Sequence, residues 1–256
     1  MTTDPAGFGA VEKALHLLDV LGRSSGLGLS EAAARSEVPK TTCLRLLRSL
    51  EAQGFVVRVG KRYRVSWRLL EVGRGAPFCE PGGLRDIAQP YLCEVHQASG
   101  WSVSLAVLDG TDVLYLSRIH RSSSFTLPGG SGARVPATCT AIGKAILAFE
   151  PEERRREVFD HGTRSLTPYS ITSPKVLDQQ FTEIRAVGLA RDREESAVGV
   201  VCMAAPVLHR GRAVAAISAS GRVERPATRS LDGLLRKAAA ATASDFAGAR
   251  WGGGAR

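Results

Sequence analysis

The sequence has no apolar run long enough to cross a lipid bilayer. Its longest uncharged stretch rich in apolar side chains, residues 197–208, contains Pro206 and falls well short of the roughly 20 residues that a membrane-spanning helix needs. The N-terminal sequence MTTDPAGFGA has neither the basic segment nor the apolar segment of a secretory signal peptide. These absences favour a cytoplasmic protein that does not bind membranes.

Cysteine is also scarce, and its spacing is irregular. The chain has five cysteines, an odd number without the spacing of a disulfide framework: Cys43, Cys79, Cys93, Cys139 and Cys202. We therefore expect reduced thiols, as in proteins of the cytoplasm. Cys93 and His96 are one helical turn apart, but no second pair of ligands has the spacing of a zinc site. The sequence therefore predicts neither a bound metal nor a cofactor.

Acidic side chains are nearly absent between residues 40 and 68. This segment has eight basic residues against one acid, Glu51, which leaves a net charge of +7 out of the +9 of the whole chain. A face that is merely solvated mixes charges of both signs, whereas a basic patch is typical of a surface that binds duplex DNA. We therefore predict double-stranded DNA as a partner.

The same region has the pattern of a winged helix-turn-helix. Ser30 is suited to cap a short alanine-rich helix. Pro39 is suited to the start of a second helix over residues 40–53. Gly54 is suited to the end of that helix. The alternating residues that follow, up to residue 65, fold back across a glycine turn as a hairpin with a basic tip.

Apolar and polar side chains separate on the second helix. One side carries Cys43, Leu46, Leu47 and Leu50, and the opposite face carries Thr41, Arg45, Arg48 and Ser49. The polar face is expected to read DNA, with base edges approached by Thr41, Thr42 and Arg45. Phosphates are expected to be held by Lys40, Arg48, Lys61, Arg62 and Arg64.

An earlier helix is predicted before this region and is closed by Gly22. Its apolar face is expected to comprise Val11, Ala14, Leu15, Leu18 and Leu21, and Leu17 is expected on another face.

Beyond residue 83 the patterns are those of a sheet domain. Alternating apolar residues predict two β-hairpins, over residues 103–119 and 200–220, each closed by a glycine turn. Amphipathic patterns predict helices over residues 84–99, 176–187 and 231–246. Hairpin-paired strands with helices to one side give an α+β sheet domain.

Proline and glycine gather between the two parts of the chain, in the stretch APFCEPGG over residues 76–83. We therefore predict a DNA-binding domain over residues 1–75, a linker over residues 76–83 and a second domain over residues 84–250.

Several blocks of the sequence resemble the IclR family of bacterial transcription regulators. The N-terminal blocks are KALHLLDVL, LSEAAARSEVPKTTCLRLLRSLEAQGFVVR and YRVSWRLLEVG; the later blocks are GWSVSLAVLDGTDVLYLSRI, TAIGKAILA, TPYSITSP, VGLARDREESAVGVVCMAAPVL and AAISASG. The resemblance implies a winged helix-turn-helix followed by a GAF-like effector-binding domain. It also implies a ligand-responsive regulator, a repressor in preference to an activator. Because one recognition helix covers few base pairs, we expect a homodimer or dimer of dimers on pseudo-palindromic operator DNA.

The resemblance also implies where the effector binds. Thr140 can cap a helix whose first N–H groups, on Ala141 and Ile142, would face an anion or a carbonyl oxygen. The polar lining of the family's site falls on Asp192, Cys202, Ser218 and Ser220. The two serines are two residues apart, so they share one face of a strand. This set favours a small organic effector that bears a carboxylate or carbonyl group.

Two other classes of protein remain open. One is an architectural DNA-binding protein with a ligand-free structural second domain. The other is an enzyme with a DNA-binding module, in which Cys139 or Cys202 acts as nucleophile and His120, His161 or His209 as base. No serine elbow, phosphate loop or paired-carboxylate motif accompanies these residues. We therefore predict a regulator without catalytic residues rather than an enzyme.

Overall fold

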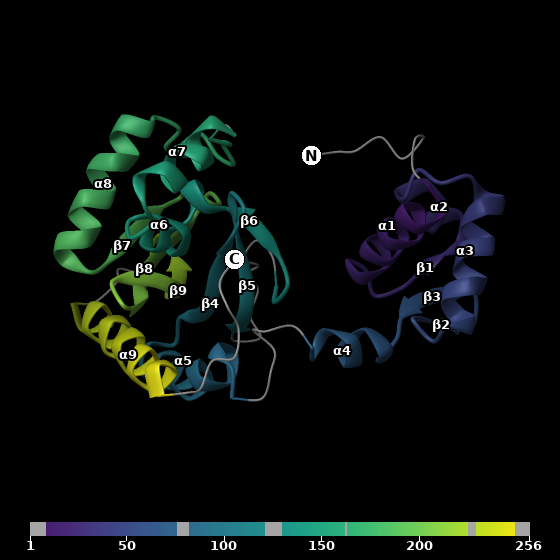
Figure 1. Cartoon of the computed structure of the whole chain (residues 1–256), viewed down its shortest axis with the longest axis horizontal. Helices are drawn as coiled ribbons and strands as arrows, with labels where there is room; N and C mark the ends of the chain where they lie inside the picture. Colours follow the sequence, from purple (N-terminus) through teal and green to yellow (C-terminus); the bar gives the residue numbers. More distant parts are fainter. Residues whose placement is uncertain (1–8, 76–81, 121–129, 162, 225–228, 249–256) are drawn as a thin grey trace. The chain divides into compact units, whose positions relative to one another are not determined.

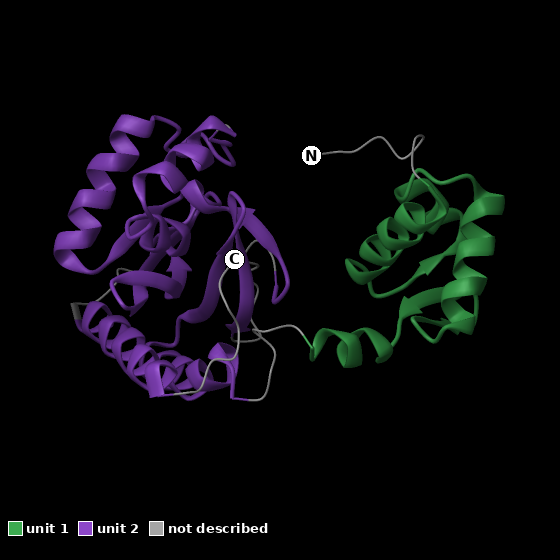
Figure 2. Ribbon diagram, in the orientation of Figure 1, with its two compact units in different colours: residues 1–77 green, residues 78–256 purple. Residues whose placement is uncertain are grey.

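The chain forms two compact units, residues 1–77 and residues 78–256 (Figure 2). The computed structural model describes residues 9–75, 82–120, 130–161, 163–224 and 229–248. The linker predicted over residues 76–83 lies mostly outside these described residues. Among them, no helix combines the length and the apolar composition that a bilayer-spanning segment requires.

The N-terminal unit is a winged helix-turn-helix, as predicted (Figure 1). Its helices are α1 (Ala10–Gly22), α2 (Leu29–Arg35), α3 (Lys40–Ala52) and α4 (Arg68–Gly73). Its strands are β1 (Leu27–Gly28), β2 (Val56–Val59) and β3 (Arg62–Val65), paired antiparallel in the order β1-β3-β2. The hairpin of β2 and β3 is the wing that follows α3.

The predicted core face of α1 was partly wrong: Leu21 is buried and Ala14 and Leu18 pack against the core as predicted, but Val11 and Leu15 do not. Leu17 and Leu21 are fully buried, whereas Val11 is 73% exposed and Leu15 is 61% exposed. α1 carries apolar residues on more than one side, and packing against α3 and β3 decides which side enters the core. Periodicity alone does not distinguish two apolar stripes on one helix.

Ser30 does not cap α2, which corrects a second prediction. The helix begins at Leu29, and the N-cap position is occupied by Gly28, two residues before Ser30. The Glu31 carboxylate reaches back and accepts the Gly28 N–H at 2.9 Å, which satisfies one unpaired donor at the helix start. The end of α3 agrees with the sequence, because Gly54 adopts a φ of 77° that favours glycine.

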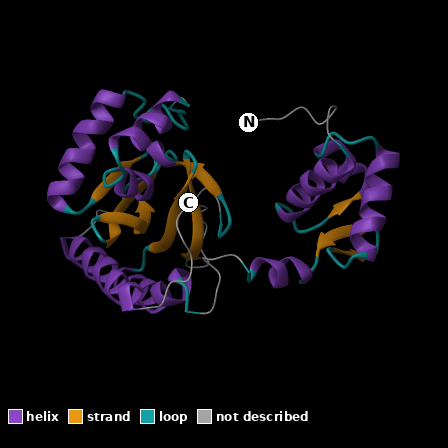
Figure 3. Cartoon of the chain, viewed as in Figure 1, coloured by secondary structure: helices purple, strands orange, loops and turns teal. Residues whose placement is uncertain are grey.

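The C-terminal unit contains a six-stranded antiparallel sheet of order β6-β5-β4-β9-β8-β7 (Figure 3). Its strands are β4 (Ser102–Asp109), β5 (Asp112–Ile119), β6 (Arg134–Pro136), β7 (Ala190–Arg193), β8 (Val200–His209) and β9 (Arg212–Arg222). The two predicted hairpins are β4–β5 and β8–β9. The short edge strands β6 and β7 were not predicted from the sequence.

Helices cover both faces of this sheet, not one face as predicted. They are α5 (Leu84–Ser99), α6 (Ala141–Leu147), α7 (Glu152–Asp160), α8 (Pro174–Val187) and α9 (Arg229–Gly248), with a 3-10 turn, η2 (Ala137–Cys139). One core packs Ala205 and Ile217 with α5 and α9, and the other packs Ala204 and Ala216 with α6 and α8 (Figure 1). The near-continuous apolar sequence of β8 and β9 is typical of strands buried on both faces.

The packing of α6 against η2 leaves no room for a side chain at Gly143. A Cβ on this buried residue would overlap the carbonyl group of Ala137. We expect Gly143→Ala to lower the free energy of unfolding by about 3 kcal/mol, measured by urea denaturation, because the backbone would have to shift. The control is Gly233→Ala at an exposed position of α9 with open space around it, which should stabilise by about 1 kcal/mol. Equal stability of Gly143→Ala and wild type would contradict this packing.

Candidate functional site

The recognition helix α3 presents an exposed polar stripe. Thr41, Arg45 and Ser49 follow one another at intervals of four residues and are all exposed, whereas Thr42 is half-buried. The opposite side of the helix is fixed in the core by Cys43, Leu46 and Leu47. The stripe is therefore free to enter a groove of DNA without disturbing the core.

The wing carries exposed cations at its tip and on its second strand. Lys61 lies in the turn after Gly60, and Arg64 is exposed on β3. Arg62 is held within the unit: its Nε and Nη2 donate to the Gly26 carbonyl at 3.1 and 2.7 Å. Its Nη2 also lies 3.2 Å from the Glu31 carboxylate. Arg62 therefore ties the wing to the segment before α2.

In the C-terminal unit a row of polar side chains crosses three strands of the sheet. The strand register places Asp192 on β7 opposite Cys202 on β8, and Cys202 opposite Ser220 on β9. Ser218 lies two residues before Ser220, on the same face, and is paired with Ser104 of β4. The Ser220 hydroxyl donates to the Cys202 Sγ at 3.0 Å. The sheet therefore brings together all four polar residues predicted for the effector site.

Asp192 is buried at one end of this polar row. Its carboxylate accepts the Glu195 N–H at 2.7 Å and the Ser196 hydroxyl at 2.8 Å. Burial raises the pKa of Asp192 to about 6, against these hydrogen bonds, which lower it. The side chain can therefore change protonation state close to neutral pH.

The two candidate nucleophiles are neutral thiols. Burial raises the pKa of Cys202, and the negative charge of Asp192 raises it further. Burial also raises the pKa of Cys139, whose Sγ donates to the Arg164 carbonyl at 2.8 Å. A thiolate is the nucleophilic form of cysteine, so neither environment favours nucleophilic catalysis. No cluster of three or more histidine, cysteine or acidic side chains in the described part of the chain could hold a metal ion.

Thr140 caps α6 as predicted. Its Oγ1 accepts the Gly143 N–H at 3.0 Å, and both Ala141 and Ile142 are buried in the core at the start of the helix. Lys144 follows on the same helix and is also fully buried. Its ammonium forms an ion pair with Glu195 at 2.7 Å and donates to the Gln180 side-chain oxygen at 3.0 Å. α6 is thereby tied to the loop that holds Asp192.

Sequence reasoning missed two further residues on the polar face of the sheet. The Arg118 Nε on β5 donates to the Ser104 hydroxyl at 3.0 Å, and its guanidinium lies 4.2 Å from the centre of the Tyr115 ring. Ser104 and Arg118 are paired in the sheet register, next to Ser218. Their alternation within β4 and β5 was visible, but only the pairing of β4 with β9 places them beside the polar row.

The comparisons with known proteins agree in both units. Residues 80–246 match the family described as bacterial transcriptional regulator IclR C-terminal, and residues 10–60 match the IclR helix-turn-helix domain. The chain belongs to the IclR family of bacterial transcriptional regulators. This assignment confirms the family, the fold class and the regulatory function predicted from the sequence.

IclR-family relatives match almost the whole chain. The glycerol operon regulatory protein of Streptomyces griseus is 33% identical over 252 residues, 94% of this chain and 98% of the relative. The transcriptional repressor IclR of Escherichia coli K12 is 30% identical over 223 residues, 84% of this chain and 81% of the relative. A crystal structure of an IclR homolog from Microbacterium hydrocarbonoxydans, complexed with 4-hydroxybenzoate, has the same fold. The two structures superpose with a TM-score of 0.83 at 22% sequence identity. The match covers 94% of this chain and 100% of the Microbacterium chain.

The raised pKa of Asp192 makes the stability of this IclR-family chain depend on pH. The folded chain holds this proton more tightly than the unfolded chain, whose carboxyl has a pKa near 3.8, so the free energy of unfolding falls as pH rises through about 6. Between pH ~4 and ~7.5, wild type should lose about 2.5 kcal/mol relative to Asp192→Asn. The measurement is urea denaturation across this range, and Asp160→Asn, at an exposed position of α7, is the control. Parallel curves for wild type and Asp192→Asn would refute the raised pKa.

Proposed function

We propose that this IclR-family regulator binds a pseudo-palindromic operator as a homodimer or a dimer of dimers, and that a small organic effector changes its affinity for DNA. The observation that carries the proposal is the presence in one chain of an exposed basic reading surface on α3 and a buried polar row in a separate sheet domain. An effector bound at the polar row can alter DNA affinity only if it favours one arrangement of the DNA-binding domains of the subunits over another. Residues 76–83 are rich in proline and glycine, which disfavours a rigid connection between the two domains. The coupling therefore acts through the arrangement of the subunits relative to one another.

The proposed contacts with DNA divide by role. Base edges are approached by Thr41, Thr42 and Arg45, which lie on or beside the exposed stripe of α3. Phosphates are held by Lys40, Arg48, Lys61, Arg62 and Arg64, all of them exposed. Of these, Arg62 is the one whose guanidinium is already bonded to Gly26 and Glu31.

The proposed effector site is formed by Asp192, Cys202, Ser218 and Ser220, with the N–H groups of Ala141 and Ile142 at the start of α6. Hydroxyl groups and a protonated Asp192 can donate hydrogen bonds, and the nearby Arg118 adds a positive charge. These groups favour an effector with a carboxylate or carbonyl group. The 4-hydroxybenzoate bound by the Microbacterium protein carries a carboxylate, so small organic acids are the first compounds to test.

The proposed regulator is a repressor, acts in the cytoplasm where the chromosome lies, and is not an enzyme. Its E. coli relative is named as a transcriptional repressor, which supports this choice over an activator. The alternative function is an architectural DNA-binding protein whose second domain binds no ligand. A buried row of hydroxyls beside a titratable carboxylate favours the ligand-responsive function, since a purely structural sheet has no need of such polar groups.

The base-reading role of Arg45 can be tested once an operator has been selected from a pool of random duplexes. Arg45→Ala should lower the preference for operator over random DNA by about 1–3 kcal/mol, because a bidentate contact with guanine would be lost. The control is Arg23→Ala, at an exposed position of the same unit where Arg23 pairs with Asp19. An unchanged preference in Arg45→Ala would remove this residue from the base-reading set.

The effector site can be tested by a thermal-shift screen with small organic acids, including 4-hydroxybenzoate. A stabilising compound should raise the melting temperature of wild type, and Ser218→Ala should lose that shift while it binds DNA normally without ligand. The matched control is Ser117→Ala, because Ser117 is also buried in the sheet but bonds Gln89 of α5 on the other face. If Ser218→Ala keeps the shift, the compound binds elsewhere. If no acid raises the melting temperature of wild type, the result supports the architectural alternative.

A further inference from the structure

The turn between α1 and β1 is bonded on one side to the end of α1 and on the other side to the wing. Its central residue, Gly26, is buried. The Gly26 N–H donates to the Ser24 hydroxyl at 3.3 Å, and this hydroxyl donates to the Leu21 carbonyl at 3.0 Å. The Gly26 carbonyl accepts hydrogen bonds from the Nε and the Nη2 of Arg62, on β3, at 3.1 and 2.7 Å. Gly26 therefore links the last turn of α1 to the wing.

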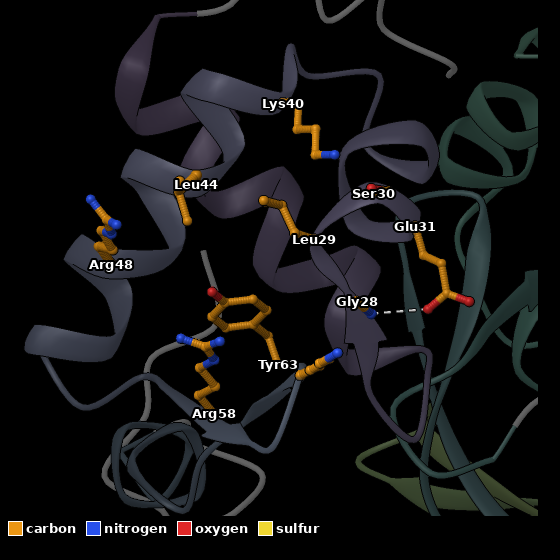
Figure 4. A pocket seen from close by; sticks show the side chains of 10 residues that line it. Gly28, Leu29, Ser30, Glu31, Lys40, Leu44, Arg48, Arg58 and Tyr63 are labelled. Atoms are coloured by element: carbon orange, nitrogen blue, oxygen red, sulfur yellow. Dashed lines mark hydrogen bonds between the residues drawn. The ribbon is translucent and has the colours of Figure 1, made fainter.

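Arg62 is also paired with Glu31, at the start of α2. One atom, the Oε2 of Glu31, lies 3.2 Å from the Nη2 of Arg62 and accepts the Gly28 N–H at 2.9 Å. Figure 4 shows Glu31 folded back toward Gly28, with this hydrogen bond drawn as a dashed line. The Gly28 N–H and the positive charge of Arg62 both lower the pKa of Glu31. The carboxylate is therefore ionised, and it compensates the charge of the guanidinium.

A second arginine of β3 packs on the same turn. Gly26 has a φ of 127°, in the region that favours glycine, and a Cβ at this position would lie 2.8 Å from the Cγ of Arg64 and 2.9 Å from its Nε. The side chain of Arg64 therefore lies directly over the Gly26 backbone. The strand register adds to this contact, because β1 and β3 pair at Gly28 and Arg62. The position of the wing relative to α1 and α2 is thus fixed at this turn.

These bonds leave Arg62 poorly suited to hold a phosphate. The fork formed by its Nε and Nη2, which would bind a phosphate bidentately, is taken by the Gly26 carbonyl. Its charge is compensated by Glu31, so binding DNA through Arg62 would require the existing bonds to break. A wing that is already held in one position, by contrast, loses less conformational entropy when it meets DNA.

We propose that Arg62 is a positioning residue: it holds the wing in the position that meets DNA, through Gly26 and Glu31, and does not itself bind a phosphate. This inference rests on the proposed function, because it takes the wing to contact DNA. It changes that function in one respect, since it removes Arg62 from the proposed phosphate set. The other exposed cations of the wing keep their proposed role.

The first test is Arg62→Lys, which keeps the charge but lacks the fork that reaches Gly26 and Glu31 together. Binding of a short random-sequence duplex is measured by fluorescence anisotropy across a range of salt concentrations. Arg62→Lys should bind about fivefold more weakly than wild type at every salt concentration, because a mobile wing adds an entropy cost that salt does not screen. A phosphate contact predicts instead that Arg62→Lys binds like wild type, and that Arg62→Gln lowers the slope of log K against log salt by about 0.9.

The matched control for the lysine substitution is Arg23→Lys. Arg23 is an exposed arginine of the same unit, and its Nε and Nη2 also donate to an acceptor, the carboxylate of Asp19. Because this pair lies within α1 and the residue that follows it, and does not involve the wing, Arg23→Lys should leave the affinity for the duplex unchanged.

The second test moves the wing without changing any charge. In Gly26→Ala the added Cβ would displace Arg64 and strain the backbone, so the affinity should fall several-fold while the salt slope stays as in wild type. The matched control is Gly22→Ala, at the end of α1, where an added Cβ meets open space. Gly22→Ala should bind the duplex as wild type does.

Affinities are compared at a temperature at which circular dichroism shows each variant to be folded, and Arg62→Lys decides alone if Gly26→Ala does not fold. The proposal is overturned if folded Arg62→Lys binds the duplex as wild type does. A lower slope for Arg62→Gln would then make Arg62 a phosphate contact, and a lower melting temperature alone would make it a residue that only stabilises the fold. Failure of the proposed function looks different, because wild type itself would then not bind the duplex, and this inference would fall with it.

Discussion

The buried ion pair between Lys144 and Glu195 joins α6 to the loop beside Asp192 in the C-terminal unit. Both side chains are buried, and Gln180 of α8 accepts a second hydrogen bond from the same ammonium. The Glu195 Oε2 is buried without a hydrogen-bond partner among the described residues, so Lys144 is the main compensation for this carboxylate. Removing one member of such a pair typically costs about 3–5 kcal/mol, because the other charge is left buried and unpaired.

The loop that carries Glu195 also holds Asp192 in place. The Glu195 N–H and the Ser196 hydroxyl bond the Asp192 carboxylate, and the Thr167 and Ser170 hydroxyls donate to the loop's carbonyl groups. Buried polar networks are stable only when their members are satisfied together. One loop therefore bonds both the Asp192 carboxylate and Lys144 of α6. Changes in the packing of α6 are expected to alter the ionisation of Asp192 through this loop.

In the N-terminal unit, by contrast, the proposed DNA-binding side chains must stay exposed to solvent. The packing of Cys43, Leu46 and Leu47 fixes the rotation of α3 and so decides which side chains face outward. Contacts with phosphates supply affinity that does not depend on sequence, whereas contacts with base edges supply specificity. In the proposed set of contacts, Arg45 approaches base edges and Arg48 holds a phosphate, so mutations at these two residues would distinguish the two roles.

The sequence by itself determined the protein family and the elements whose signals are local. Glycine turns and alternating or helical periodicities report on residues a few positions away, so the winged helix-turn-helix and both hairpins of the sheet were predictable. The polar set around Asp192 came from family resemblance. Only the tertiary structure decided which stripe of α1 is buried, that β4 lies beside β9 and brings Arg118 to the polar row, and that Arg62 is bonded to Gly26 and Glu31. These features depend on pairing between distant segments, for which a single sequence has no local signal.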